Sequence, residues 1–259
     1  MEMSDFNMNF FSLAGKNAIV TGGNGGLGQA FCTALAKAGA NVFVPSIVDD
    51  DGSTRKLVED CGTKYQFMLA DITAEGECKH IVDECARALG GVDILINCAG
   101  ISINERDVTK FGRAQWDKMV SVNFTAAFEM IHEVCPHMIA QQSGKIINIA
   151  SLFSFLGGQW SPAYAATKHG IVGLTKSMCD ELGQFNIQVN AIAPGYFATP
   201  LTEMTRKDEN RNAQILAHIP SNRWGWTADL MGATVFLASQ ASDYINGTVL
   251  TVDGGYMMR

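Results

Sequence analysis

The stretch TGGNGGLG, residues 21–28, constrains the fold more than any other part of this sequence. The preceding run NAIV predicts a β-strand, and the following run LGQAFCTALAKAGA predicts a helix that ends at Gly39. A plain strand-to-helix turn needs one glycine, whereas this loop has five. Gly22 permits a sharp turn, and Gly26 and Gly28 leave room for a pyrophosphate and for packing of the helix on the strand. Since a helix N-terminus also offers unpaired N–H groups to phosphates, the loop predicts a dinucleotide-binding site.

Short β-prone runs alternate with longer helical runs along most of the chain. The expected strands are NAIVTGG, NVFVPSIV, KYQFMLADI, VDILINCAG, GKIINIAS, IQVNAIAPG and TVLTVDGG. Strands that alternate with helices imply parallel pairing and right-handed crossovers. The pattern predicts an α/β fold of the Rossmann type, a doubly wound parallel sheet of about seven strands with helices on both faces. We expect residues 14–259 to form one such domain, because no linker, repeat or low-complexity segment interrupts them.

Charge and cysteine content exclude several kinds of partner. The net charge of −7 argues against nucleic acid, because a phosphate backbone needs a basic surface. The seven cysteines are scattered without the spacing of a metal site, so we expect no metal and a reduced, cytoplasmic compartment. The acidic N-terminus does not resemble a signal peptide, and no apolar run reaches the roughly eighteen residues of a membrane span. We therefore expect a soluble protein with no membrane partner.

The first thirteen residues form an apolar extension ahead of the expected domain. Its large apolar side chains are Phe6, Met8, Phe10, Phe11 and Leu13. Because such side chains are a solubility liability in water, we expect them to lie against another surface, and we expect Phe6, Phe10 and Phe11 to dock on a hydrophobic groove of the same or an adjacent protomer. Charged residues make up only 17% of the chain, which indicates that part of the surface is buried between subunits.

Tyr164 and Lys168 stand four residues apart in the Ala-rich run SPAYAATKHG. On a helix these positions lie almost directly above each other, so the phenol and the ammonium group can point into the same space. An isolated pair of this kind is more often a surface tyrosine beside a solvated lysine. The glycine loop upstream makes a functional interpretation stronger.

Together these motifs resemble those of the short-chain dehydrogenase/reductase family over residues 14–259. The markers occur in the family's order: the glycine loop, Asp71-Ile72, Asn97-Cys98-Ala99-Gly100, Asn123, Ser151, Tyr164, Lys168, Pro194-Gly195 with Thr199, and Asp253-Gly254-Gly255. One departure is Cys98, where the family usually has a second asparagine. The resemblance implies an NAD(P)-dependent oxidoreductase that transfers a hydride between a nicotinamide and a small-molecule ketone or secondary alcohol. It also implies a homotetramer.

The resemblance further implies a catalytic tetrad of Asn123, Ser151, Tyr164 and Lys168. Hydride transfer at a carbonyl carbon requires proton exchange at its oxygen, and a free tyrosine with a pKa near 10 holds its proton too tightly. Lys168 and an oxidised nicotinamide would lower that pKa by favouring the phenolate. Ser151 would hold the substrate oxygen, and Lys168 would also bind the ribose. Asn123 would anchor a water that relays protons.

The glycine loop and the resemblance together indicate which residues contact the coenzyme. They are Gly22, Asn24, Gly26, Leu27, Gly28, Ser46, Ile47, Asp71, Ile72, Asn97, Ala99, Gly100, Tyr164, Lys168, Pro194, Gly195, Phe197 and Thr199. A 2′-phosphate requires Arg or Lys at the end of the second strand, where Ser46 and Ile47 stand and three aspartates follow. We therefore expect NAD(H) to be favoured over NADP(H), unless Arg55 or Lys56 folds back onto the phosphate.

The substrate class has two main interpretations. Within the family, the C-terminal half looks most like the gluconate and 2-dehydro-3-deoxygluconate dehydrogenases, which implies a sugar acid. The side chains expected around the tetrad are mostly apolar: Ile101, Ile103, Leu152, Phe153, Phe155, Leu156, Trp160, Tyr196, Phe197 and Leu201. A carboxylate should instead meet an arginine fork, and only Arg206, Lys207 and Arg211 stand where they could supply a cation.

The apolar lining favours a bulky ketone or secondary alcohol such as a hydroxysteroid, with a sugar acid as the alternative. The expected substrate contacts are Ser151, Phe153, Trp160, Tyr164 and Tyr196. A third class, a non-catalytic NAD-binding sensor, has little need of a complete tetrad, and fold alone never proves turnover. Oxidation of NADH with a panel of ketones separates an enzyme from such a sensor.

Overall fold

The centre of the protein is one sheet of seven parallel strands in the order β3-β2-β1-β4-β5-β6-β7. The structure, a computed structural model, describes residue 3 and residues 6–259. The strands are β1 (Asn17–Val20), β2 (Asn41–Ser46), β3 (Tyr65–Leu69), β4 (Ile94–Asn97), β5 (Gly144–Ile149), β6 (Ile187–Pro194) and β7 (Val249–Val252). The strand order reverses between β1 and β4, which is where open sheets of this kind bind ligands. The predicted single-domain, doubly wound Rossmann fold is confirmed.

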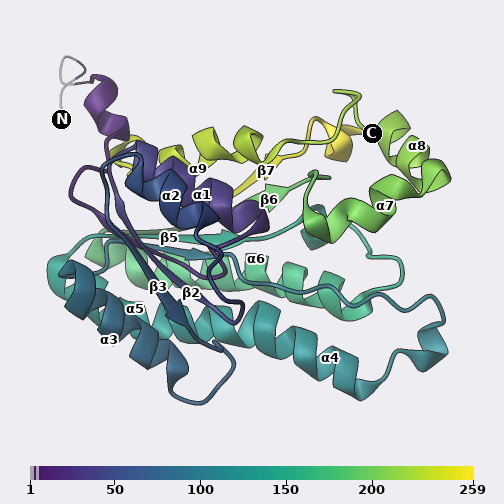
Figure 1. The fold of residues 1–259 in the computed structure, drawn as a ribbon, viewed down its shortest axis with the longest axis horizontal. Helices are drawn as coiled ribbons and strands as arrows, with labels where there is room; N and C mark the ends of the chain where they lie inside the picture. Colours follow the sequence, from purple (N-terminus) through teal and green to yellow (C-terminus); the bar gives the residue numbers. More distant parts are fainter. Residues whose placement is uncertain (1–2, 4–5) are drawn as a thin grey trace.

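Helices cover both faces of the sheet (Figure 1). On one face α1 (Gly26–Lys37) packs against α2 (Ser53–Glu59) and α9 (Met231–Ala238). The other face carries α3 (Glu77–Leu89), α4 (Arg113–Val120), α5 (Ala126–Gln141) and α6 (Pro162–Leu182). A π-helical turn at Ser121–Thr125 separates α4 from α5 in what is otherwise one continuous helical run from Arg113 to Gln141. Among the described helices, none is both long and apolar enough to cross a membrane.

A charged insert follows β6 and stands at one end of the molecule. It consists of α7 (Glu203–Lys207) and α8 (Glu209–His218), and the last residues of the sequence lie beside it (Figure 1). Because the insert follows a strand at its carboxyl end, it stands over the edge of the sheet where the site is expected.

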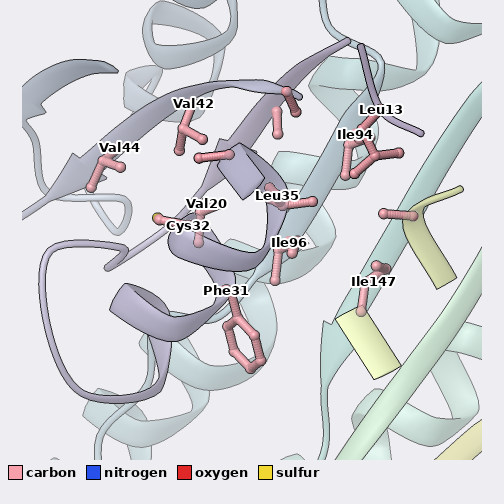
Figure 2. Packing of buried hydrophobic residues seen from close by; sticks show 14 of the residues in the cluster. Leu13, Val20, Phe31, Cys32, Leu35, Val42, Val44, Ile94, Ile96 and Ile147 are labelled. Atoms are coloured by element: carbon pink, nitrogen blue, oxygen red, sulfur yellow. The ribbon is translucent and has the colours of Figure 1, made fainter. Parts of the chain in front are cut away.

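Two hydrophobic clusters, one on each face of the sheet, hold the layers together. On the α1 face, the fully buried side chains of Phe31 and Leu35 pack with those of Val20 and Ile96 (Figure 2). The central strands are buried on both faces, which explains their continuous apolar runs. Each fully buried side chain of this size stabilises the fold by roughly 1.5–3 kcal/mol.

The N-terminal extension is only partly covered. Leu13 is buried in the cluster on the α1 face, and its N–H donates to Ala38 O at 2.8 Å. Phe11 is half-buried and forms one wall of an open apolar groove between α1 and α9. Phe6 and Met8 remain 62% and 75% exposed, although the ring of Phe6 lies 5.2 Å from that of Phe10. Phe6 and Met8 are therefore not covered within one protomer, and docking of Phe6 on an adjacent protomer stays a prediction.

Candidate active site

Three structural elements bring the predicted tetrad to the carboxyl edge of the sheet. Ser151 follows β5, and Tyr164 and Lys168 lie one turn apart near the start of α6. Asn123 lies in the π-helical turn between α4 and α5, which packs against α6. Three of these side chains are buried, and that of Tyr164 is partly exposed.

Lys168 is held inside the site. Its Nζ donates a 2.6 Å hydrogen bond to Ile149 O, the last carbonyl of β5, and lies 5.6 Å from the centre of the Tyr164 ring. Burial lowers the pKa of Lys168 from 10.5 to about 8, and the nearby Cys98 thiol acts weakly in the opposite direction. A buried ammonium group with one hydrogen bond has unused donors for a further acceptor.

Tyr164 packs at 6.1 Å, edge to face, against the ring of Phe153. Burial raises the pKa of Tyr164, and a hydrogen bond with Ser151 lowers it. Lys168 Nζ donates its hydrogen bond to Ile149 O, and the lowering of the Tyr164 pKa by Lys168 and an oxidised nicotinamide stays a prediction.

Ser151 begins a short 3-10 turn at Leu152–Ser154 and caps it. Its Oγ accepts from Phe153 N at 3.2 Å, and its own N–H donates to Ser154 Oγ at 3.2 Å. Ser154 Oγ in turn donates to Lys168 O at 2.7 Å. The sequence analysis did not single out Ser154, although its spacing from Ser151 is that of a capping box.

The side-chain amide of Asn123 forms two hydrogen bonds with the main chain of Ile101, as a neighbouring strand would. Its Oδ1 accepts from Ile101 N and its Nδ2 donates to Ile101 O, both at 2.8 Å. These bonds fix the loop that follows β4 next to α6. Because both amide atoms are engaged with Ile101, the side chain acts here as a brace for that loop.

The glycine loop has the shape that a pyrophosphate requires. Gly22 has a φ of +66°, and a Cβ there would stand 3.3 Å from Ala99 Cα. A Cβ on Gly28 would overlap the carbonyl oxygen of Gly22, so Gly28 allows α1 to pack on the loop. Gly25 and Gly26 face open space. Since no side chain caps the N-terminus of α1, its N–H groups are available to an anion, and the loop fits a dinucleotide.

The loop after β2 contains no unpaired cation among the described residues. Asn24 Nδ2 donates to Val48 O at 2.8 Å and ties this loop to the glycine loop. Ser46 is buried, whereas Ile47 is 68% exposed. Two basic side chains follow this loop, on α2, and both are paired with carboxylates. Arg55 pairs with Asp50 at 3.3 Å, and Lys56 pairs with Asp60 at 2.8 Å.

Asp71 and Asn97, two of the predicted coenzyme contacts, are both hydrogen-bonded within the protein. Asp71 accepts from the N–H and hydroxyl of Thr73, which lower its pKa, and Ile72 beside it is buried. Asn97 stands opposite Asn148 across β4 and β5 and donates to its Oδ1 at 2.9 Å. Asn97 Oδ1 is buried without a partner among the described residues, so it can accept a further hydrogen bond.

Ala99 N donates to Thr21 Oγ1 at 3.0 Å, which positions Ala99 and the exposed Gly100 at the glycine loop.

The segment after β6 is tightly packed. Gly195 follows Pro194, and a Cβ on Gly195 would stand 2.6 Å from Asp253 Cα. Phe197 is buried against Gly225, and it lines a small cavity together with Tyr196 and Asp253. Thr199 is also buried, and its carbonyl accepts from Arg206 Nη2 at 3.1 Å.

The apolar lining expected around the tetrad is only partly present. Leu152 and Phe197 are buried in the core, while Phe155 and Leu201 are exposed, and Ile101 and Ile103 are half-buried. An enclosed apolar pocket for a large ketone is therefore not assembled by these side chains.

Two arginines lie close to the ring of Trp160. The guanidinium carbon of Arg106 lies 4.9 Å from its ring centre, and that of Arg211 lies 5.6 Å away. The backbone holds this arrangement, since Glu105 N donates to Trp160 O at 2.9 Å. The sequence analysis named Trp160 and Arg211 separately and missed Arg106, whose loop carries no motif.

Three arginines near the mouth of the site have no carboxylate partner. Arg106, Arg206 and Arg211 form no ion pair within the part of the chain that the structure describes, and Arg206 Nε is buried without a hydrogen-bond partner there. Lys207, which was considered with them, pairs with Glu203 at 2.7 Å. In the described ranges, no group of His, Cys, Asp and Glu side chains is arranged to hold a metal ion.

A fold and site of this kind define a Rossmann-type oxidoreductase. The family model for short chain dehydrogenases matches residues 16–210, and the chain belongs to this family. It is 60% identical over 258 residues to an uncharacterized oxidoreductase, YgcW, of Escherichia coli (strain K12), covering 99% of this chain and 98% of that protein. It is 44% identical over 250 residues to 2-dehydro-3-deoxy-D-gluconate 5-dehydrogenase of the same strain, covering 96% and 98%.

Solved structures show the same resemblance. A protein of Agrobacterium tumefaciens, provisionally described as a 2-deoxy-D-gluconate 3-dehydrogenase and solved with bound NADP, is 43% identical, with a TM-score of 0.90 over 97% of this chain and 100% of that chain. A gluconate 5-dehydrogenase of Burkholderia cenocepacia J2315, in complex with NADP and tartrate, is 35% identical, with a TM-score of 0.90 over 97% and 98%. These relatives favour the sugar-acid alternative and do not support the steroid interpretation or the expected preference for NAD(H).

Proposed function

We propose that this protein transfers a hydride between a nicotinamide coenzyme and a hydroxyl or keto carbon of a sugar acid of the gluconate or 2-dehydro-3-deoxygluconate type. The observation that carries this proposal is the pair of arginines on Trp160. The names of the relatives point to the same class of substrate.

Recognition of the acid rests on the arginines that have no carboxylate partner in the described structure. A guanidinium group matches a carboxylate in two parallel hydrogen bonds, and such charged hydrogen bonds are stronger than neutral ones. Arg106 and Arg211 approach Trp160 from the loop after β4 and from α8, so an anion between them contacts both segments. The partly apolar walls then contact the carbon chain, while Ser151 and Tyr164 face the reacting carbon.

The tetrad handles the proton. A bound oxidised nicotinamide would accept the hydride and supply a positive charge that favours the Tyr164 phenolate. Tyr164 Oη takes the proton of the substrate hydroxyl in oxidation and returns it in reduction, while Ser151 Oγ donates a hydrogen bond to the same oxygen. The Lys168 ammonium group stabilises the phenolate and donates to the ribose. Asn123 holds the loop at Ile101 so that the site keeps its shape.

We propose that the coenzyme pocket accepts NADP(H) as well as NAD(H). The neighbours solved with bound NADP support this. In this chain Asp50, in the loop that follows β2, forms an ion pair with Arg55 at the start of α2. Arg55 contacts a 2′-phosphate only when it leaves Asp50, so this pair sets the ratio between the two coenzymes.

Assembly as a homotetramer also belongs to the proposal. Phe128 of α5 and Trp116 of α4 are exposed on the outer helical layer of the protomer, where a second copy would cover them. Sedimentation at micromolar concentration tests this assembly, and a monomer there contradicts it.

Steady-state kinetics with D-gluconate and with D-sorbitol, a neutral polyol of the same length, test the substrate class. Losing a charged hydrogen bond costs about 1.5–3 kcal/mol, so Arg106→Ala and Arg211→Ala should each raise KM for the acid by roughly 10- to 100-fold and leave sorbitol turnover unchanged. Arg223→Ala, which removes a surface arginine paired with Asp229, is the matched control. Wild-type turnover of steroids or apolar cyclic ketones, without turnover of any sugar acid, would overturn the proposal. If the protein turned over no alcohol or ketone at all, the interpretation as a non-catalytic NAD-binding sensor would remain.

A further inference from the structure

The last residues of the sequence, Gly254–Arg259, pack against the carboxyl end of α8 and the residues that follow it. The carboxylate of Asp253 accepts from Gly255 N and Met257 N, each at 2.8 Å, and so shapes the turn that begins Gly254–Arg259. Gly255 has a φ of +89°, and a Cβ there would stand 2.9 Å from the ring of Pro220. The segment therefore lies in direct contact with the residues that follow α8.

Two hydrogen bonds and a ring contact fix the carboxyl end of α8 to this segment. Arg259 Nη1 donates to Ala217 O at 3.2 Å, and His218 Nε2 lies 3.1 Å from Arg259 O. The ring of Tyr256 lies 4.3 Å from that of His218. Figure 1 shows the C-terminal end of the chain beside α8.

A row of aromatic rings continues from Tyr256 toward the site. Its ring centre lies 5.1 Å from that of Tyr196, which lies 5.5 Å, edge to face, from that of Trp224. Trp224 Nε1 then donates to Asn212 Oδ1 on α8 at 2.7 Å. Arg211, the neighbour of Asn212, is one of the two arginines on Trp160.

Tyr196 meets both ends of this arrangement. Burial and the contact with Tyr256 raise the pKa of Tyr196 to about 12, against the opposite effect of Arg211. Tyr196 thus interacts both with a residue of the final segment and with a residue of the proposed carboxylate site.

We propose that the final segment, Gly254–Arg259, is a positioning device that holds α8 so that Arg211 faces Trp160, with Tyr256 as its central residue. It thereby sets the selectivity of the site for an anionic substrate. This inference rests on the proposed function, because it assigns the final segment to the recognition of the sugar acid.

Tyr256→Ala and Tyr256→Phe test this role, with the fully exposed Tyr244→Ala as the matched control. Since Tyr256 acts through Arg211, we expect Tyr256→Ala to raise KM for D-gluconate by about tenfold with little change in kcat or in sorbitol turnover. Tyr256→Phe keeps the ring contacts and should restore most of the affinity. In a double variant with Arg211→Ala, the effect of Tyr256→Ala should disappear, because the two residues act as one unit.

Hydrogen exchange of residues 209–218 supplies a readout that is independent of turnover. We expect Tyr256→Ala to accelerate exchange in α8 and Tyr244→Ala to leave it unchanged. A Tyr256→Ala protein with wild-type KM for gluconate overturns the inference while the proposed function stands. If the wild type turns over no sugar acid, the proposed function fails, and unchanged exchange in α8 of Tyr256→Ala then refutes the positioning role separately.

Discussion

Ser154 Oγ donates a 2.7 Å hydrogen bond to the main-chain carbonyl of Lys168, and both residues are buried. Ser154 also accepts from the N–H of Ser151. One hydroxyl therefore joins the loop that carries Ser151 to the helix that carries Tyr164 and Lys168. The relative placement of three proposed catalytic groups depends on this residue.

Ser154→Ala should lower kcat and also lower the free energy of unfolding, while the variant still folds. Removing a buried hydroxyl and leaving its partner unpaired costs about 1–3 kcal/mol of unfolding free energy. We expect kcat with D-gluconate to fall by roughly tenfold, because a small displacement of Ser151 relative to Tyr164 disturbs proton transfer. Kinetics and thermal unfolding, compared with Tyr244→Ala, measure both effects. Wild-type kcat in a folded variant would show that Ser154 plays no positioning role.

Tyr164→Phe should remove proton exchange and preserve coenzyme binding. The phenol exchanges a proton but does not hold the phosphates, so we expect kcat to fall by about 10²–10⁴-fold with an unchanged coenzyme Kd. Lys168→Ala should lose activity and weaken coenzyme binding together, since the ammonium group serves both. Fluorescence titration with NADH, next to turnover assays, separates the two. Substantial turnover by Tyr164→Phe contradicts the assignment.

Lys168 should make the stability of the protein depend on pH at alkaline values. Its pKa is about 8 in the folded state and 10.5 without burial, so between these values the unfolded chain binds more protons. The contribution of Lys168 to the free energy of unfolding therefore rises with pH across this window, by roughly 3 kcal/mol in total.

Urea unfolding of the wild type and of Lys168→Met at pH 7.5, 8.5 and 9.5 measures this contribution. We expect the difference between the two proteins to shift in favour of the wild type as the pH rises. A difference that is constant across these pH values means that Lys168 is not depressed in pKa.

Asp50→Asn should shift the coenzyme preference toward NADP(H). In the structure Asp50 holds Arg55 at 3.3 Å, and removing its charge frees the guanidinium for a 2′-phosphate. The side chain of Arg55 is 45% exposed and that of Asp50 is 8% exposed, and Glu59 still attracts Arg55 from 3.9 Å in the variant. If freeing Arg55 contributes about 1 kcal/mol, kcat/KM for NADP should rise by about threefold to fivefold relative to NAD. Asp83→Asn, which frees Lys79 on α3, is the matched control. An equal ratio in Asp50→Asn and wild type refutes the role of the pair.

Gly25→Ala and Gly28→Ala should separate coenzyme binding from folding. A Cβ on Gly28 overlaps the Gly22 carbonyl, so Gly28→Ala should destabilise the protein by about 1–3 kcal/mol or more. Gly25 has an extended φ of −167° and faces open space, so Gly25→Ala should keep the wild-type melting temperature. It should nevertheless weaken NADH binding, because the new methyl group stands where the pyrophosphate approaches. Unchanged NADH affinity in Gly25→Ala would place the phosphates elsewhere.

The fold class, the glycine loop and the positions of the candidate tetrad could be predicted from the amino-acid sequence. These features are local: strand and helix periodicity, glycines at a strand-to-helix turn, and a tyrosine and lysine one helical turn apart. Each can be recognised without knowing what the rest of the chain does. The apolar lining was predicted less well, because apolar residues near a motif serve the core as readily as a pocket. Phe197 is an example, since it packs on Gly225.

The placement of the arginines on Trp160 could not be predicted from the sequence, because it depends on the tertiary structure. Arg106 and Arg211 come from a loop after β4 and from α8, and no spacing in the sequence indicates that both lie on Trp160. The pairing of Arg55 with Asp50 and the contact of Tyr256 with Tyr196 are decided in the same way. Side-chain contacts between distant segments depend on how the helices and loops pack over the sheet edge, and local periodicity carries no record of that packing.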